Sequence, residues 1–212
     1  IPAATAVGPS GCVLAIDAAR DLLSLVPRKA RAEGLGNIHI AAGDLLDVCV
    51  VDAAFDAVVC VFGIFFVPDM RRAVRELWRC VRPGGHLAIT TWGPRLFEPV
   101  STVFWHAVRR ERPDLYKAFN PWDILVHPEP LLALMEESGV PAAQVAAEAG
   151  AHPLPTPAAW WALVMGSGYR GTVDQLAPDA RERVRTHSED YIASAHVTAV
   201  ETNVLYATAV KG

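Results

Sequence analysis

The feature that constrains this chain most is an alternation of short apolar runs and helical patterns between residues 12 and 92. The apolar runs are "CVLAID", "NIHIAA", "FDAVVCVF" and "HLAITTW", at residues 12–17, 37–42, 55–62 and 86–92. Their length and composition predict strands. The stretch "AVVCVF" is apolar without alternation, as in a strand that is buried on both faces. The sequence therefore predicts an α/β fold with a parallel sheet and covering helices.

Helical patterns fill the spaces between these runs. Residues 18–34 carry a broad apolar face and end at Gly34, and Pro27 predicts a kink or a restart inside this segment. Residues 68–85 place apolar side chains at helical spacing and break at the Pro-Gly-Gly of residues 83–85. We therefore expect a helix between each pair of consecutive strands where the spacing allows one.

After Trp92 the alternation of strand and helix patterns ends. One helical segment, at about residues 98–111, leads into a loop that is rich in aromatic residues and proline, and this insertion is a candidate lid or substrate cover. Further helices follow, with a probable-strand pattern at 143–149 and a final alternating strand at 199–210. No Gly/Ser linker or internal repeat divides the 212 residues, which suit one α/β domain with an appendage.

Charge and composition narrow the classes of partner. The net charge of −4 argues against a nucleic-acid or anionic-membrane surface, so we expect a small-molecule partner. The longest apolar run, residues 57–67, is too short to span a bilayer, and no signal peptide is visible, which predicts a cytoplasmic protein. The four cysteines form no C-x-x-C pair and the histidines have no ligand-like spacing, so no metal site is predicted.

Acidic residues follow two of the predicted strands. Ligands of parallel α/β sheets bind outside the carboxyl ends of the strands. Asp17 ends the first run, and its carboxylate could accept hydrogen bonds from two vicinal hydroxyls, as in a ribose. Asp44 follows the second run, where Gly43 permits a tight turn, and it could accept from an exocyclic amine. A helix cap for Asp17 and a solvated turn for Asp44 stay open.

Taken together, these features resemble the S-adenosylmethionine-dependent methyltransferases of the Rossmann-like class, in particular the small-molecule branch of quinone biosynthesis. The resemblance lies in the strand-end acid, the Gly-Asp turn, the "FDAVVC" strand and the helix that closes on "RPGG". It covers residues 1–93 and becomes looser over 94–212. It implies a mostly parallel Rossmann-like sheet with flanking helices, an antiparallel C-terminal strand and a helical insertion after the Trp92 strand.

The resemblance also implies a cofactor site. Residues 1–93 would be the cofactor-binding part, and 94–212 the substrate cover and C-terminal strands of the same domain. S-adenosylmethionine would be the cofactor. Its contacts would be the ribose at Asp17 and Ala18, the adenine at Asp44 and Leu45, and the methionine end at Cys60, Phe62 and Gly63.

One departure from the family pattern lies at the start. In the family a first strand runs into a glycine-rich loop beside the methionine part of the cofactor. Here "IPAATAVGPSG" resembles the tail of the helix that follows such a loop. We therefore expect the strand that ends at Asp17 to lack its usual neighbour.

The implied reaction is methyl transfer to an oxygen, nitrogen or carbon nucleophile of a small molecule. His106 and His127 are candidates for a general base, although surface or capping roles suit them too. Aromatic walls for the acceptor would come from Phe65, Trp92, Trp122 and Tyr169, which fit a core equally well. A non-catalytic binding protein and a nicotinamide-dependent oxidoreductase are the alternatives, the latter without a Y-x-x-x-K pair. A homodimer is left open.

Overall fold

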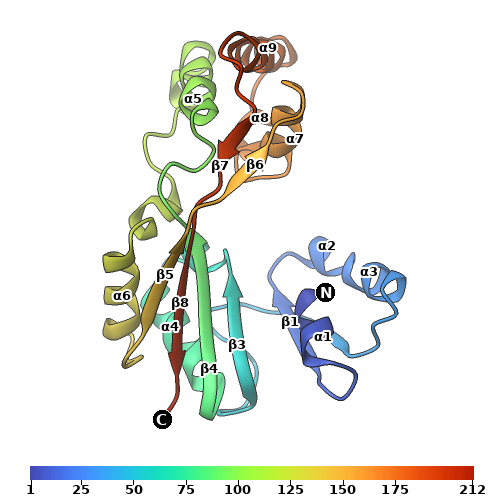
Figure 1. Cartoon of the computed structure of the whole chain (residues 1–212), viewed down its shortest axis with the longest axis vertical. Helices are drawn as coiled ribbons and strands as arrows, with labels where there is room; N and C mark the ends of the chain where they lie inside the picture. Colours follow the sequence, from blue (N-terminus) through green and yellow to red (C-terminus); the bar gives the residue numbers. More distant parts are fainter.

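The computed structural model describes all 212 residues, which form three bodies (Figure 1). We call them the N-terminal body, the main sheet with its helices, and the aromatic lobe. The N-terminal body stands beside β3 of the main sheet, and the aromatic lobe stands beyond one end of that sheet (Figure 1).

The N-terminal body consists of residues 1–42. It contains α1 (Pro2–Val7), β1 (Val13–Asp17), α2 (Arg20–Leu23), α3 (Val26–Ala32) and β2 (Ile38–Ala42). β1 and β2 are parallel and pair in register from Val13 opposite Ile38 to Asp17 opposite Ala42. The predicted restart at Pro27 is confirmed, because α2 and α3 are separate helices and Pro27 lies in the first turn of α3.

The main sheet contains four strands in the order β3-β4-β8-β5. Its elements are β3 (Phe55–Val61), η1 (Ile64–Phe66), α4 (Met70–Cys80), β4 (Val81–Trp92), η3 (Pro121–Leu125), α6 (Pro128–Glu137), β5 (Gln144–Glu148) and β8 (Val204–Val210). β3 and β4 are parallel, and β8 is antiparallel to both β4 and β5. The antiparallel C-terminal strand is thus confirmed, and it lies inside the sheet rather than at its edge.

The aromatic lobe is built from the insertion after β4 and from later segments. It contains α5 (Val100–Glu111), η2 (Pro113–Leu115), β6 (Ala151–Pro153), α7 (Ala159–Met165), α8 (Arg170–Val173), α9 (Pro178–Ser194) and β7 (Ala199–Glu201). Its centre is a group of buried rings in edge-to-face or stacked contact: Phe97, Phe104, Trp105, Trp160 and Tyr169. The predicted helical insertion after Trp92 is therefore confirmed.

Two predictions differ from the structure at element level. The final strand expected over residues 199–210 is interrupted at Thr202–Asn203 and forms β7 and β8. The strand expected over 86–92 begins at Val81, because Val81 pairs with Phe55 before the chain loops out through Pro83–Gly85 and pairs again at His86. β6 was not predicted, because its three residues are too few to show an alternating apolar pattern.

The parallel strands do not form one continuous sheet. β1 and β2 pair only with each other, and β3 pairs only with β4. β1 therefore has one free edge, as expected from the sequence, and so does β3. Several apolar side chains on these strands are exposed, among them Ile16, Ile40, Val59 and Val61. The prediction that "AVVCVF" is buried on both faces is therefore wrong, because β3 is an edge strand and only Cys60 of this strand is buried.

α4 is fixed at both ends by polar contacts. At its start the Asp69 carboxylate accepts a hydrogen bond from the backbone N–H of Arg72 at 2.9 Å, which is an N-cap. At its end Lys211 Nζ donates to the carbonyl oxygens of Trp78 and Val81 at 2.7 and 2.8 Å. The Trp78 carbonyl also accepts from the N–H of Val81, and the lysine adds a positive charge that offsets the dipole at the C-terminal end of α4.

Candidate functional site

The carboxyl ends of β1 and β2 bring the two predicted acidic positions together. Asp17 is opposite Ala42, and the backbone N–H of Gly43 donates to the Asp17 carbonyl oxygen at 3.2 Å. Gly43 is required for this close approach, because a Cβ atom there would lie 2.8 Å from a methyl group of Ile16. Asp44 follows directly, so both carboxylates lie at the same end of the N-terminal body.

Each of these carboxylates makes one local contact and is otherwise exposed. Asp17 Oδ1 accepts from the N–H of Ala19 at 2.8 Å, and Asp44 Oδ1 accepts from the N–H of Leu46 at 2.9 Å. The second oxygen of each carboxylate has no partner within the protein. The capping and turn roles that the sequence left open are thus present, and each acid keeps an oxygen free to accept from a ligand. Ala18, between Asp17 and Ala19, is exposed beside them.

The segment after Asp44 joins this acidic end to the main sheet. Leu45 and Leu46 pack on the hydrophobic core of the rest of the molecule. Arg79 of α4 then holds the following residues. Its guanidinium donates to the carbonyl oxygens of Val48 and Val50 at 2.9 and 2.8 Å, and it is paired with Asp52 and Glu76. Arg79 therefore sets where the segment that carries Asp44 meets the sheet.

A second group of predicted residues lies at the carboxyl end of β3. Cys60 is buried, with 7% of its surface exposed, and burial raises the pKa of its thiol, while the backbone N–H groups of Gly63 and Ile64 lower it. Phe62 has a φ of 49°, which is unusual for a residue with a bulky side chain. Its N–H donates to the backbone oxygen and the hydroxyl of Thr90, at 3.1 and 3.2 Å. These two bonds hold the strained turn in place.

Aromatic side chains continue from this turn into the lobe. The rings of Phe62 and Trp92 are stacked with their centroids 4.0 Å apart and an interplanar angle of 19°. Trp92 contacts Phe97 at 6.3 Å, and Phe97 contacts Tyr169 edge to face at 5.6 Å. Tyr169 is buried, its hydroxyl lies 2.8 Å from that of Ser101, and burial raises its pKa. The predicted aromatic residues are therefore connected, with Tyr169 at the inner end.

Phe65 and Trp122 form a neighbouring contact. Their centroids are 5.9 Å apart, and both side chains are buried. Trp122 is placed by η3, whose start is fixed by a capping box between Asn120 and Asp123. Phe66, next to Phe65, is by contrast 65% exposed. The four predicted acceptor-binding residues thus lie in or next to one hydrophobic core, as the sequence also allowed.

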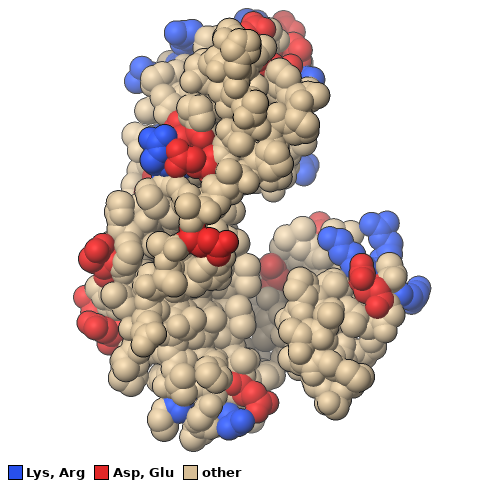
Figure 2. Space-filling view, in the orientation of Figure 1, with Lys and Arg blue, Asp and Glu red and all other residues tan.

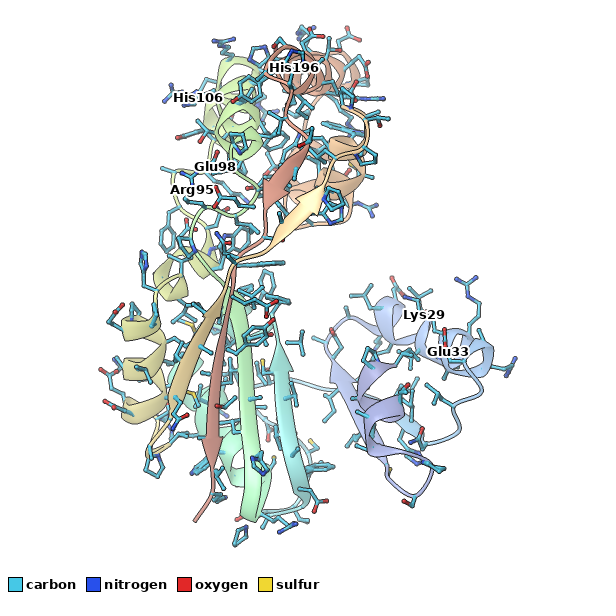
Figure 3. All side chains as sticks on the ribbon, in the orientation of Figure 1. Lys29, Glu33, Arg95, Glu98, His106 and His196 are labelled. Carbon is cyan, nitrogen blue, oxygen red and sulfur yellow. The ribbon has the colours of Figure 1, made fainter.

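The two histidines predicted as base candidates lie at the surface. His106 is exposed on α5 of the aromatic lobe (Figure 3), and His127 is exposed at the N-cap position of α6, where it makes no capping hydrogen bond. The structure does not bring either histidine to the acidic end of the N-terminal body. Each is therefore available to solvent rather than held by neighbouring polar groups.

A recess lies beside the N-terminal body. Figure 2 shows it between the N-terminal body and the rest of the molecule, with few charged side chains along its visible walls.

No group of three His, Cys, Asp or Glu side chains could hold a metal ion. None of the helices has the length and apolar character needed to cross a bilayer.

Sequence reasoning did not find Thr90 or Arg79. Thr90 is one of two threonines in the predicted strand "HLAITTW", and only the register of β4 against β3 shows that it faces Phe62. Arg79 lies in a helical pattern with several other arginines, where a solvated face is the ordinary expectation. The signal for Arg79 is tertiary, since the carbonyl oxygens that it binds are about thirty residues away in the chain.

Comparison with known proteins finds matches to methyltransferases. The family model described as "Methyltransferase domain" matches residues 2–89. A demethylmenaquinone methyltransferase of Geobacillus kaustophilus is 36% identical over 98 residues, which are 46% of this chain and 42% of that protein. The chain thus matches less than half the length of this curated relative.

Solved structures extend the likeness to the whole fold. The YcgJ protein of Bacillus subtilis has a TM-score of 0.56 at 15% identity, covering 93% of this chain and 81% of that protein. Phosphoethanolamine N-methyltransferase 2 of Haemonchus contortus, solved with S-adenosylhomocysteine, has a TM-score of 0.55 at 15% identity and covers 99% of this chain and 46% of that protein. The predicted Rossmann-like α/β fold and the resemblance to S-adenosylmethionine-dependent methyltransferases are therefore confirmed.

Proposed function

We propose that this chain, which has a methyltransferase fold, binds S-adenosylmethionine at the carboxyl ends of its parallel strands and transfers the methyl group to a small molecule. One observation carries the proposal. Asp17 and Asp44 lie at the same end of β1 and β2, each exposed and each with one free carboxylate oxygen, inside the segment that matches the methyltransferase family.

The residues of the chain fit parts of this cofactor. The free oxygen of Asp17 suits the ribose hydroxyls, since a carboxylate accepts strong hydrogen bonds from a vicinal diol. Asp44 and Leu45 would flank the adenine, with the acid accepting from its amine and Leu45 packing on the ring. Cys60, Phe62 and Gly63 would line the methionine end, because the turn held by Thr90 places their backbone at the carboxyl end of β3.

The chemistry asks little of the protein beyond position. The bound cofactor supplies an activated methyl group on a sulfonium, which a nucleophile displaces in line. The aromatic side chains around Phe62 would keep water from the reacting atoms and orient the acceptor. A hydroxyl acceptor would also need a general base, for which His106 and His127 stay candidates.

The acceptor that we propose is a planar aromatic molecule. The relative from Geobacillus is named for demethylmenaquinone, and the partly exposed stacked pair of Phe62 and Trp92 would give this chain a flat apolar surface, while Phe65 and Trp122 are buried in the core. Tyr169 would support this wall from within the lobe through Phe97.

We further propose a cytoplasmic location, which cell fractionation would check. A homodimer is left to be tested by light scattering.

A specific observation favours one alternative, a binding protein without catalysis. β1 and β3 each have a free edge, so the parallel strands that would carry the cofactor are not joined in one sheet. A nicotinamide-dependent oxidoreductase is the second alternative, because a strand-end acid also binds the ribose of that cofactor.

Calorimetry of the full-length gene product separates these three functions. We expect S-adenosylmethionine to bind and NADH not to bind. The absence of detectable S-adenosylmethionine binding would overturn the enzyme proposal, and binding of NADH would favour the oxidoreductase. Binding of S-adenosylmethionine without methyl transfer to any aromatic acceptor would favour the binding protein.

Substitution of Asp17 tests the role of its carboxylate. Asp17→Ala should weaken S-adenosylmethionine binding about tenfold to a hundredfold, which corresponds to the loss of a charge-assisted hydrogen bond. Asp17→Asn keeps an oxygen that can accept from the N–H of Ala19 and separates ligand binding from capping. The matched control is Asp21→Ala in α2. Unchanged binding in Asp17→Ala would mean that Asp17 is only a cap.

A further inference from the structure

The aromatic lobe and the main sheet are joined by one continuous two-stranded ribbon. β5 and β8 pair in the sheet up to Glu148 opposite Val204, and β6 and β7 pair in the lobe from Ala151 opposite Glu201. Two residues separate these pairs on each strand, so the register does not change between sheet and lobe. β5–β6 and β7–β8 are thus two long strands that share a single interruption (Figure 1).

A side chain replaces a backbone bond at this interruption. The N–H of Thr202 still donates to the Gly150 carbonyl oxygen at 2.8 Å, as in an ordinary ladder. The N–H of Gly150, however, donates to Asn203 Oδ1 at 3.1 Å instead of to a backbone oxygen. The backbones are so close here that a Cβ atom at position 150 would clash with the Thr202 carbonyl oxygen. The ribbon is therefore interrupted at a point fixed by Gly150 and Asn203.

The chain leaving β4 meets the ribbon at the same residue. The N–H of Gly93 donates to the Asn203 carbonyl oxygen at 2.7 Å, and Asn203 Nδ2 donates to the Pro94 carbonyl oxygen at 3.0 Å. A Cβ atom at position 93 would lie 2.9 Å from Asn203 Cβ, so glycine is needed here as well. We call the three segments that meet here, residues 93–98, 149–150 and 201–203, the neck.

Glu201 strengthens the neck beside Asn203. Its carboxylate accepts from Asn203 Nδ2 at 3.0 Å and from Arg95 Nε at 2.8 Å, and its backbone bonds both to Phe97 and to Glu98. Figure 3 shows Arg95 and Glu98 at this level, between the sheet and the lobe. The amide of Asn203 thus uses both of its donor hydrogens and its oxygen to hold the neck segments together.

Apolar packing also holds the lobe, because the lobe and the main sheet contribute to one hydrophobic core. α5, α7 and α9 pack extensively on one another or on other lobe elements rather than on the strands of the main sheet. The apolar contact of Trp92 with Phe97 and the connection through residues 112–127 also cross between the two parts. The hydrophobic effect is non-directional, whereas the hydrogen bonds of Asn203 are directional and join three segments at one point.

We propose that Asn203 is a positioning residue that sets the orientation of the aromatic lobe over the carboxyl ends of β3 and β4, where three neck segments share its amide. The effect of this lobe orientation on methyl transfer rests on the proposed function. The acceptor would lie between the turn at Phe62 on the sheet and the lobe, so a lobe held at another angle would misplace the acceptor but leave Asp17 and Asp44 untouched.

The test measures the distance between lobe and sheet directly. Nitroxide labels are placed at Thr186→Cys on α9 and Arg75→Cys on α4, both exposed, in a background in which Cys12 and Cys49 are serine. Pulsed electron resonance then compares the wild-type neck with Asn203→Ala. The matched control is Gln144→Ala, an exposed amide in the same ribbon with no side-chain hydrogen bond.

We expect the distance distribution of Asn203→Ala to be at least about twofold broader than that of the wild type and of the control. S-adenosylmethionine affinity should stay within about twofold, because the acids that bind it lie in another body. A folded Asn203→Ala protein with the wild-type distribution would overturn the proposal, since a residue that only stabilises the fold would change the melting temperature and not the distance.

A second variant covers the case in which Asn203→Ala does not fold. Asn203→Asp keeps an oxygen for the N–H of Gly150 but loses both donors and brings a negative charge to Glu201. It should broaden the distribution as well, and a wild-type distribution in this variant would overturn the proposal too. The distance measurement needs no ligand, so the role of Asn203 and the binding of S-adenosylmethionine can fail separately.

Discussion

The N-terminal body and the main sheet are both built from parallel strands, yet they are packed very differently. The N-terminal body has three buried side chains, two of which are alanine: Ala4, Leu23 and Ala30. The main sheet and the aromatic lobe share one core of 34 buried residues, all of them at position 60 or later. The N-terminal body thus has the smaller core, although the family match over residues 2–89 covers both this body and part of the main sheet.

The family resemblance does not follow this difference in packing. The matched segment 2–89 contains the residues expected to touch a cofactor, and such residues lie at strand ends and in turns, where they bury little apolar surface. Its exposed apolar strand residues, Ile16 and Ile40, show that the N-terminal body is not closed by its own side chains. We therefore expect it to open locally more readily than the main sheet.

Thiol labelling should give the largest contrast between the two regions. Cys12 of the N-terminal body is exposed, whereas Cys60 of β3 is buried and has a raised pKa, so little of its thiolate is present or accessible. We expect Cys60 to react at least about a thousandfold more slowly than Cys12 with a thiol reagent at pH 8. Mass spectrometry of timed samples measures both rates. Similar rates would mean that β3 opens as readily as the N-terminal body.

Truncation of one leucine in each region should give the next largest contrast. Leu87 of β4 has no exposed surface, and Leu87→Ala should lower the free energy of unfolding by about 2–5 kcal/mol. Leu22 of α2 is 60% exposed, and Leu22→Ala should change the free energy of unfolding by less than about 0.5 kcal/mol. Urea unfolding followed by tryptophan fluorescence measures both, and equal losses would remove the distinction between the regions.

Substitution of Arg79, which connects the two regions, should have an intermediate effect on stability. Arg79→Met leaves the carbonyl oxygens of Val48 and Val50 without their charged donor and should destabilise the protein by about 1–3 kcal/mol. Hydrogen exchange should become faster from Val48 to Ala53. Arg72→Met, also on α4 but with no side-chain partner, serves as the control and should leave exchange in this segment unchanged. The prediction fails if both variants behave alike.

The smallest effect should be the alkaline dependence of stability in the main sheet. The folded state raises the pKa of the Cys60 thiol, chiefly by burial, so the folded protein keeps a proton that the unfolded chain releases. Stability from this group is complete below the unfolded pKa, about 8.5, and declines as the pH rises above it. Urea unfolding from pH 7 to 10 should show a shallower decline in Cys60→Ala than in the wild type. An equal slope would contradict the assignment.

The strands of the first 92 residues could be predicted because their signal is local. Runs such as "AVVCVF" are apolar enough to specify a strand without knowledge of the neighbours, although its burial on both faces was predicted wrongly. The break at Thr202–Asn203 could not be predicted, because the alternation of side chains continues through it. Its cause is a bond between Asn203 and Gly150, 53 residues apart, and no local pattern reports such a contact.

The candidate site divides in the same way. Asp17 and Asp44 were found because a strand end and a Gly-Asp turn are visible in the sequence. The stack of Phe62 on Trp92 depends on the register of β3 against β4, and the buried position of Tyr169 depends on the packing of the whole lobe. The sequence could name these aromatic residues but could not distinguish a ligand wall from a core.

The position of β8 constrains the order in which the protein can fold. β4 and β5 do not pair with each other, and only β8, the last strand in sequence, joins them. During synthesis β3 and β4 can pair as soon as they are made, but β5 has no partner until residues 204–210 have emerged. The main sheet therefore cannot be completed in the order in which its strands are synthesised. Until β8 is made, β5 is an unpaired strand that a chaperone could protect.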